Sequence, residues 1–577
     1  MTRGKSSADF STSPMINHLE NKHVENYKEY NQEIESHKKV DHQAKRPKLL
    51  QFLNSKGEDL NVRKKNFQLK LMEFIYLDFM PFNVVNGQGF QSLMSFLAPN
   101  LVIHCNTFFS RTMLPKEYET KCMKIKKILN ECEFLGSTTD MSFSVHYIDK
   151  NWIRKKIILS VEKFNEAHTS ENLFERLNTI IDNWNIRNKI QFISTDNAFN
   201  IVKAVKSMNV ESQGCFAHHI NLIIRNSLKN NEKLTELIRK IRTVINTIKN
   251  SVQLKRKFRE NQMTLNMKEN NLIPDIVTRW NSTFFMLERF LQNENPVRLT
   301  LNLDIDEEEI EILKQLTEIL KIFAELTNII SKEDNSISVI LPSISSIKTY
   351  VQKYMENLGK SEERNKFTEI INFGENLINE IEKYFSDIEQ NWLLCAATIL
   401  DPRYKETYFK SPKFQNKRRC YIINEAMKVS ENTNPPVNVE FNLDLIHPEL
   451  KKIKYENSES KSETEKSFNF WDIVDKAEEN NDNNEEDNKN DVNKKLQFYL
   501  KMPIQLKKTN PLLFWNENGS VLYPLNILAK KFFSFPACTV TSERLFSAAS
   551  QIITKRRNMI KAKNAEMLLV LRENHNI

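Results

Sequence analysis

Two aspartates follow stretches of sequence that are typical of β-strands. Asp140 comes after Ser137-Thr138-Thr139, and Asp196 comes after Ser194-Thr195. Strand ends are rigid positions, so two acids on neighbouring strands can hold divalent metal ions between them. Magnesium prefers carboxylate oxygens and keeps waters that phosphate oxygens can replace, as in two-metal phosphoryl transfer. The structural alternative is that each aspartate caps the turn at the end of its strand.

A cysteine and a histidine with metal-ligand spacing follow the second aspartate. Cys215 and His218 form a Cys-x-x-His string, but no second Cys/His pair lies nearby to complete four ligands. We therefore expect no structural zinc there. His218 is predicted either to contact a phosphate or to be an ordinary histidine at the start of a helix.

Arg279 and Trp280 place a cation beside a large aromatic ring. Arginine pairs with phosphate, and tryptophan can stack on an unstacked base, so both are candidate DNA-binding residues. A buried tryptophan next to a surface arginine explains the same dipeptide equally well.

Glu543 is a third candidate acid. Thr541 to Ser547 reads as a capped helix start, and Lys555-Arg556-Arg557 follow closely. In the first turn of a helix, a glutamate also serves simply as a favourable partner of the helix dipole.

The elements that must position these residues change along the chain. Alternating and β-branched stretches predict strands at 134–140, 143–148, 156–161 and 190–196, with helices over about 170–184 and 198–208. Three strands, a crossover helix and a further strand indicate an α/β domain with a mixed sheet. After Gly214 the pattern is helical for more than 200 residues, as at 232–250 and 306–331.

Composition excludes several classes of protein. No apolar run in the 577 residues approaches the ~20 needed to span a bilayer, and the N-terminus lacks the apolar core of a signal peptide, so we expect neither a membrane nor a secreted protein. The seven cysteines are scattered, which argues against a disulfide framework. With nine glycines, the chain has no glycine-rich phosphate loop.

Net charge hints at a polyanionic partner. The formal charge is +9, although residues 475–491 are strongly acidic, so the rest of the chain is more basic than this total suggests. Residues 1–60 are polar and without periodicity, and we expect them to be mostly disordered. Within them, Lys45-Arg46-Pro47-Lys48 is either a nuclear-import signal or a solvated run of charge.

Seven strings in collinear order resemble the hAT superfamily of DNA transposases, in its BED-finger branch. They span roughly residues 60–577: Pro81-Phe82-Asn83-Val84-Val85 with Gly89-Phe90, Thr138-Thr139-Asp140, Ser194-Thr195-Asp196-Asn197-Ala198, Cys215-x-Ala217-His218-x-Ile220-Asn221-Leu222, Thr278-Arg279-Trp280-Asn281-Ser282-Thr283, Leu400-Asp401-Pro402-Arg403-Tyr404-Lys405, and Ser542-Glu543-Arg544-Leu545-Phe546-Ser547-Ala548-Ala549.

The resemblance implies a fold of class α/β plus all-α, in which an RNase H-like catalytic core is interrupted by a long helical insertion. It implies that Asp140, Asp196 and Glu543 form a D-D-E triad holding two Mg²⁺ or Mn²⁺ ions. His218 would sit beside the scissile phosphate, and Trp280 would stack a flipped base. The implied partners are double-stranded DNA and, through 509–577, a second copy of the chain as a homodimer or higher oligomer, in the nucleus.

With this resemblance, six segments are expected. They are a disordered segment 1–60, a helical intermediate domain 61–128, the first part of the RNase H-like core 129–223, a helical insertion 224–455, an acidic linker 456–508, and a dimerisation region 509–577 that completes the core.

Three departures from the family pattern bear on activity. An aromatic residue is usual at position 142, where this chain has serine, and a glycine is usual at 550, also serine here. Residues 1–60 contain no cysteine, so we expect no BED finger in this sequence. Without that finger, DNA binding would rest on basic surface and on the helical insertion, mainly through phosphates.

Three readings of function stay open. The chain is an active cut-and-paste transposase with an intact triad, or a catalytically inactive domesticated transposase that acts as a DNA- or protein-binding transcriptional regulator, or a defective copy without a cellular role. The triad favours the first reading, and the absent finger favours the second.

Overall fold

The computed structural model describes eleven stretches of the chain. These are residues 60–99, 101–139, 142–161, 166–276, 279–301, 303–332, 335–360, 365–431, 484–540, 545 and 560–577. Asp140, Glu543, the basic run at Lys45 and most of the acidic segment lie outside them. The chain divides into two compact units, one of residues 1–75 and 80–109, the other of residues 76–79 and 110–577.

The smaller unit is helical in its described part. Its elements are α4 (Leu60–Leu77, whose last residues belong to the larger unit), a 3₁₀ helix η2 (Phe82–Asn86), α5 (Gln88–Leu97) and α6 (Asn106–Phe108). Met72, Ile75 and Val85 are fully buried. This unit is helical, as expected, but residues 110–128 of the expected helical domain 61–128 belong to the larger unit.

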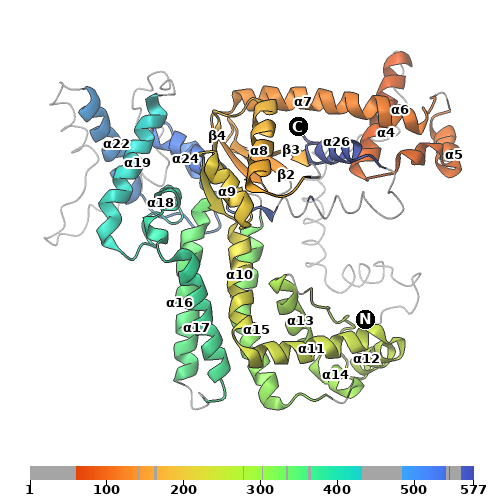
Figure 1. Ribbon diagram of the computed structural model, residues 1–577, viewed down its shortest axis with the longest axis vertical. Coiled ribbons are helices and arrows are strands. Elements are labelled where there is room, and N and C mark those ends of the chain that lie inside the picture. The colour runs from red at the N-terminus through yellow and green to blue at the C-terminus, as the bar shows by residue number, and fades with distance from the viewer. Residues whose placement is uncertain are drawn as a thin grey trace, which may run out of the picture. The chain divides into compact units, whose positions relative to one another are not determined.

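A five-stranded mixed sheet lies in the larger unit (Figure 1). Its order is β3-β2-β1-β4-β5, built from β1 (Leu135–Thr139), β2 (Ser142–Ile148), β3 (Arg154–Val161), β4 (Ile190–Thr195) and β5 (Glu211–Gly214). β1 and β2 are antiparallel, as are β2 and β3, whereas β1, β4 and β5 run parallel. The predicted mixed sheet is confirmed. The polar strand β5, Glu-Ser-Gln-Gly, was not expected.

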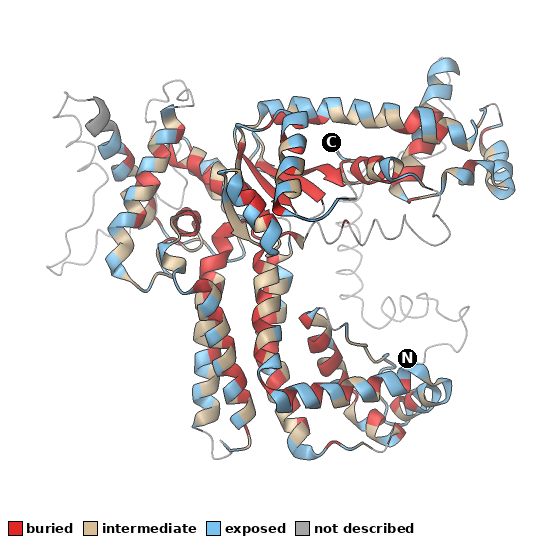
Figure 2. Cartoon of the chain, viewed as in Figure 1, coloured by how far each residue is buried: buried red, intermediate tan, exposed pale blue. Residues whose placement is uncertain are grey.

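One face of the sheet packs against three helices. They are α7 (Leu114–Glu131), α8 (Ser170–Trp184) and α9 (Phe199–Ser207), and their apolar stripes form one buried cluster with the strands. Leu135, Val145 and Ile193 belong to that cluster and are fully buried. Figure 2 shows that β1 to β4 are mostly buried, as a sheet covered on both faces requires, whereas the edge strand β5 is partly exposed.

The other face is covered by a segment that comes from far along the chain. α24 (Leu525–Ser534) leads into residues 534–539, where the Phe535 ring stacks on Phe192 with centroids 4.7 Å apart. A Cβ at Gly136 would lie 2.4 Å from the carbonyl oxygen of Ser534, so only glycine allows this approach.

Ten helices follow β5 between residues 216 and 431 in the described part of the chain. Their bounds are α10 (Phe216–Lys229), α11 (Glu232–Asn250), α12 (Val252–Thr264), α13 (Trp280–Gln292), α14 (Glu294–Thr300), α15 (Glu307–Ile330), α16 (Ile340–Gly359), α17 (Thr368–Phe385), α18 (Trp392–Ile399) and α19 (Gln415–Glu431). Asp306 forms a capping box at the start of α15. The helices predicted at 232–250 and 306–331 are confirmed as α11 and α15.

The C-terminal part contains α22 (Asn484–Lys501), α23 (Pro511–Asn518), α24 and α26 (Ala562–Glu573). The expected linker 456–508 extends too far, because α22 is helical and packs against α19. Val492, Leu496 and Tyr499 recur at i, i+4 and i+7 and are buried. The Asn, Asp and Lys residues around them masked this apolar stripe in the sequence.

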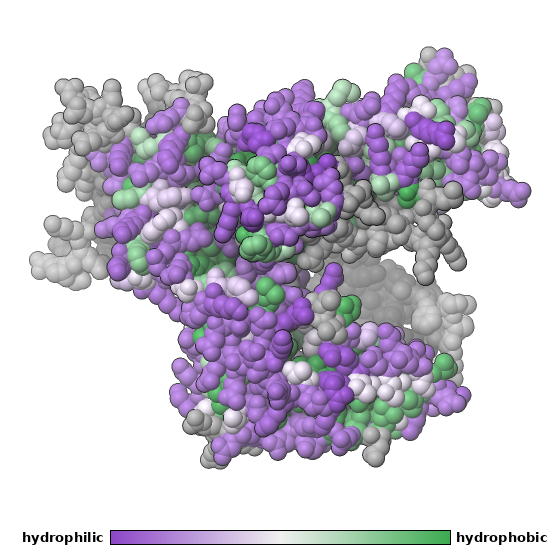
Figure 3. All heavy atoms as spheres, in the orientation of Figure 1, coloured by the Kyte–Doolittle hydropathy of each residue, from purple (hydrophilic) through white to green (hydrophobic). Residues whose placement is uncertain are grey.

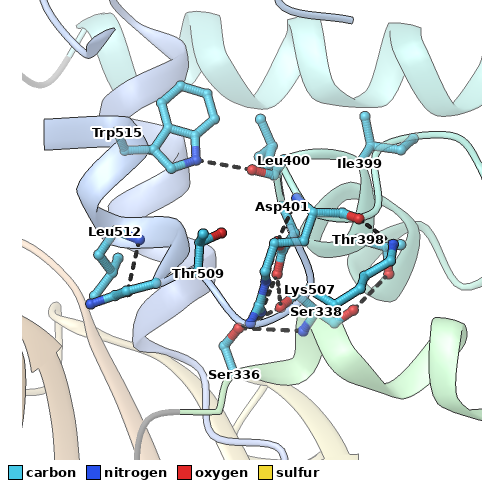
Figure 4. Close-up of polar contacts among 12 residues, drawn as sticks. Ser336, Ser338, Thr398, Ile399, Leu400, Asp401, Lys507, Thr509, Leu512 and Trp515 are labelled. Atoms are coloured by element: carbon cyan, nitrogen blue, oxygen red, sulfur yellow. Dashed lines mark hydrogen bonds and ion pairs between the residues drawn. The ribbon is translucent and has the colours of Figure 1, made fainter. Parts of the chain in front are cut away.

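The turn after α18 contains a buried ion pair and contacts the C-terminal helix α23 (Figure 4). The Asp401 side chain is fully buried and accepts hydrogen bonds from Arg403 Nε at 2.8 Å, Arg403 Nη2 at 2.7 Å and Ser338 Oγ at 2.8 Å. Next to it, Trp515 Nε1 of α23 donates to the carbonyl oxygen of Leu400 at 2.9 Å. The Leu400–Lys405 string therefore has a structural role, as the turn on which α23 is seated.

Among the described residues, no helix combines the length and the apolar composition needed to cross a bilayer. Hydrophilic side chains predominate on the face drawn in Figure 3.

Replacing Asp401 with asparagine should destabilise the protein by about 3–5 kcal/mol, because the buried Arg403 guanidinium would lose its counter-charge. The matched control is Asp182→Asn, which breaks the exposed Arg187–Asp182 pair. An exposed pair contributes only about 0–1 kcal/mol. Urea unfolding followed by tryptophan fluorescence measures both. An equal loss of unfolding free energy in the two variants would show that the Asp401–Arg403 pair stabilises the protein no more than an exposed pair does.

Candidate functional site

Asp196 leaves the sheet at the end where β1 and β4 both finish. Thr139 and Thr195 are register partners in the parallel β1–β4 pair, and each immediately precedes an acid, Asp140 or Asp196. The structure therefore brings together the two strand ends that the sequence analysis singled out. Asp196 is half-buried, whereas Asp140 lies outside the described residues.

The chain that leads to Glu543 is held at the same end of β4. The Cys215 amide donates to the Thr195 carbonyl at 2.7 Å, and the Thr539 amide donates to Cys215 Sγ at 3.3 Å. One residue further, the Phe216 amide donates to the carbonyl oxygen of Ala537 at 3.0 Å. Thr539 precedes Glu543 by four residues, and Glu543 itself is outside the described part. We call the set Thr139, Thr195, Cys215 and Thr539 the strand-end corner.

A small pocket opens beside Asp196. Its volume is about 180 Å³, and its walls come from α8, α9 and the turn before α8. Asp196 Oδ1 accepts a hydrogen bond from the Ala198 amide at 3.3 Å, which holds the carboxylate near the start of α9. Asp196 is thus a positioned, partly solvated carboxylate, as a metal ligand or a capping residue must be.

Gly214, the last residue of β5, allows Asn197 and His219 to pack closely against the strand. A Cβ at this position would lie 1.9 Å from Asn197 Oδ1 and 2.7 Å from His219 Cε1. Asn197 Nδ2 and His219 Nδ1 are buried atoms without a hydrogen-bond partner among the described residues. Burial and the neighbouring His218 lower the pKa of His219 to about 4, so this imidazole is neutral at pH 7.

His218 is the third residue of α10 and is half-buried. The expected position at a helix start is confirmed, and a phosphate contact stays a prediction. One helical turn further, Asn221 Oδ1 accepts a hydrogen bond from the Trp280 amide at 3.2 Å. α10 therefore extends from the strand-end corner to the start of α13, where Arg279 and Trp280 lie.

Arg279 and Trp280 differ in exposure. Arg279 is exposed, but the Trp280 side chain is only 4% exposed and meets Phe323 edge to face at 6.5 Å. The structural alternative from the sequence, a buried tryptophan beside a surface arginine, describes this arrangement. Stacking of Trp280 on a base stays a prediction, and it would require the ring to leave the core.

Asp275 and Arg242 organise this motif, and the sequence analysis missed both. The fully buried Asp275 carboxylate accepts from Ser282 Oγ at 2.6 Å, Thr283 Oγ1 at 3.0 Å and Arg242 Nε at 3.0 Å. The signal was present as a lone acid in the apolar stretch Leu272-Ile273-Pro274-Asp275-Ile276-Val277. Its hydroxyl and guanidinium partners hold the chain that carries Arg279.

The described residues supply only part of a metal-binding set. They contain no group of three or more His, Cys, Asp or Glu side chains able to hold a metal ion. Asp196 is the one expected ligand among them, because Asp140 and Glu543 lie outside. One carboxylate at a strand end is compatible with Mg²⁺ or Mn²⁺ but does not complete a site.

Three family models match the chain in sequence order. The ZBED1 RNase-like domain matches residues 136–218, the ZBED1 RNase-like helical domain matches 214–322, and the hAT family C-terminal dimerisation region matches 495–575. The first covers the sheet with α8 and α9, the second covers α10 to α15, and the third covers the part from α22 to α26.

Curated relatives belong to the same group of proteins. Zinc finger BED domain-containing protein 4 of Homo sapiens is 22% identical over all of this chain and 49% of its own length. The Putative AC transposase of Zea mays is 22% identical over 87% of this chain and 64% of its own length. The Putative transcriptional regulator tpeD of Talaromyces stipitatus is 25% identical over 41% of this chain and 34% of its own length.

The chain spans about half the length of the human relative and less than two thirds of the maize one. The matches nevertheless agree with each other and with the collinear strings in the sequence. Together the three models and the relatives show that residues 136–322 and 495–575 are similar to domains of the hAT transposases and of the BED-finger proteins related to them.

Proposed function

We propose that the chain is a nuclear DNA-binding protein of the hAT transposase type, with a D-D-E triad of Asp140, Asp196 and Glu543 for metal-dependent DNA strand cleavage and transfer. The strand-end corner is the observation that carries this proposal. Thr139, Thr195 and Thr539 each lie within four residues of one acid, and Cys215 connects the last two, because its amide donates to the Thr195 carbonyl and its Sγ accepts from the Thr539 amide. In this proposal the sheet and the segment after α24 form an RNase H-like core, and α10–α19 form its helical insertion.

Each candidate residue has a distinct role in this proposal. Mg²⁺ or Mn²⁺, when bound, supplies charge that stabilises the scissile phosphate and activates a water. Asp196 provides carboxylate oxygens at a fixed strand end, and His218 contacts a phosphate from the first turn of α10. Arg279 pairs with a phosphate further along the same helix, because α10 and the start of α13 are joined at Asn221.

DNA binding is supported by a basic stripe on α12. Lys255, Arg256 and Arg259 are exposed on one side of this helix, while Phe258 and Gln262 are buried on the other. No acid occurs from Lys249 to Arg259 in the sequence, and Glu260 pairs with Arg256 at 2.8 Å. A stripe of this kind attracts the phosphates of double-stranded DNA without reading the sequence.

Self-association is supported by the match of 495–575 to the hAT dimerisation region. Many apolar residues of this region, including Trp515, Leu528 and Phe532, are buried within the chain itself. Ile504, Leu506 and Leu513 are 51%, 77% and 56% exposed. We assign these three side chains to the contact with a second copy, because exposed apolar side chains grouped in one segment are typical of an interface.

A second candidate function is transcriptional regulation without catalysis. The burial of Trp280 favours it, since the resemblance to cleaving transposases implies a base stacked on that ring. The fungal relative is named as a putative transcriptional regulator. Both functions require DNA binding, so cleavage is what separates them.

Replacing Asp196 with asparagine should abolish Mg²⁺- or Mn²⁺-dependent nicking while DNA binding stays nearly unchanged, because the shape is kept and a ligand charge is lost. The assay follows nicking of a labelled duplex made from the DNA that flanks the coding sequence. Equal nicking by wild type and variant would contradict the role of Asp196. Binding without nicking in both proteins would leave the regulator as the function.

Removing the α12 stripe should weaken DNA binding and lower its salt dependence. Each phosphate contact contributes about 0.9 to the slope of log K against log salt, so Lys255→Ala with Arg256→Ala and Arg259→Ala should reduce the slope by about 3. The control removes Lys314, Lys321 and Lys383, which are exposed on α15 and α17 and, like Arg256, each pair with a glutamate. An unchanged slope in the stripe variant would place the DNA elsewhere.

Charge placed at the exposed apolar side chains should prevent self-association. The double variant Leu506→Glu with Leu513→Glu should be monomeric at micromolar concentration, where wild type is a dimer or higher oligomer. Leu299→Glu is the control, since Leu299 is 54% exposed but lies in α14. Multi-angle light scattering that shows monomeric wild type would overturn self-association, and an oligomeric double variant would overturn this interface.

A further inference from the structure

The pocket beside Asp196 has the character of a site for a small flat group. Its apolar lining includes Leu173 of α8 and Ile201 of α9, two helices that lie side by side (Figure 1). His168, Asn200 and Asp196 are polar residues of the same lining. With about 180 Å³ it is smaller than the ~300–1,000 Å³ of sites for drug-sized ligands.

Phe199 forms one wall of this pocket and is 80% exposed. It is the first residue of α9, three positions after Asp196. Ile201, Ala204 and Val205 define the buried face of α9, so the helix directs position 199 away from the core. An isolated exposed apolar residue is ordinary. Phe199 is unusual, because its exposed ring lies in the wall of a pocket that also contains a candidate metal ligand.

The ring that the resemblance assigned to base stacking is not on the surface. Trp280 is 4% exposed within the helical core, whereas Phe199 presents its ring at the Asp196 end of the sheet. Nucleobases have flat apolar faces and polar edges, and they stack on aromatic side chains with little sequence preference. A lining with both apolar and polar residues and an exposed ring are complementary to such a group.

We propose that Phe199 stacks on an unpaired nucleobase of the bound DNA next to Asp196, and that the pocket between α8 and α9 receives this base. The inference rests on the proposed function, because it requires DNA at the strand-end corner. It adds a binding site to that function and assigns its ligand class, a single unstacked base. Phe199 is a positioning residue here, since it orients the strand rather than acting on the phosphate.

The test uses the full chain and a duplex with a short single-stranded tail that carries 2-aminopurine. This base fluoresces strongly when it leaves its neighbours and is quenched when it stacks on an aromatic ring. Phe199→Ala should abolish the protein-dependent change in fluorescence at one tail position and weaken binding of tailed DNA by roughly 5- to 150-fold, the equivalent of losing one stacked base. Phe199→Trp should keep the fluorescence change and the affinity for tailed DNA, whereas Phe199→Leu should lose both.

Two controls separate this inference from the proposed function. Phe96→Ala removes a ring that is 83% exposed in α5 and should change neither readout. Fully paired duplex without a tail should bind wild type and Phe199→Ala equally. If wild type binds no DNA, the proposed function and the inference both fail. If wild type binds but Phe199→Ala gives the same fluorescence and affinity on tailed DNA, the inference alone is wrong.

Discussion

The contact between the segment after α24 and Gly136 is the constraint on which the rest of the larger unit depends. Three acids that are far apart in sequence can act together only if the chain returns to the sheet after hundreds of residues. It returns where Gly136 has no side chain, and the Phe535 ring stacks on Phe192 in the space above β4. From there the backbone passes Cys215 and Thr539 at the end of β4. A larger residue at position 136 would push this segment off the sheet.

The helices between β5 and α24 are also connected to the segment after α24 by a few specific contacts. Trp515 of α23 donates to the carbonyl oxygen of Leu400, next to the buried Asp401–Arg403 pair, and the amide of Ile337 donates to the carbonyl of Phe535 at 3.0 Å. α10 connects the strand-end corner to Trp280 through Asn221. The helical part therefore supports both the sheet and the segment that carries Arg279.

The strands and long helices were predictable because their signals are local. Alternation marks β1 to β4, and a period near 3.6 marks α11 and α15. β5 was missed because a short polar edge strand has no such pattern, and α22 was missed because Asn and Lys surround its buried residues. For the site, the sequence predicted which residues are candidates but not how their side chains lie. Whether Trp280 is buried and Phe199 exposed depends on packing between helices, and the Asp275 network depends on partners 33 residues away or within eight residues along the chain.

The most direct measurement of the central claim is metal-directed cleavage of the protein backbone. Fe²⁺ replaces Mg²⁺ at carboxylate sites, and with ascorbate and peroxide it produces hydroxyl radicals that cut the nearest peptide bonds. The account predicts cuts next to Asp140, Asp196 and Glu543 in one protein, all suppressed by excess Mg²⁺ and all lost in Asp196→Asn. Cuts near Asp196 without cuts near Glu543 would contradict the convergence of the three acids.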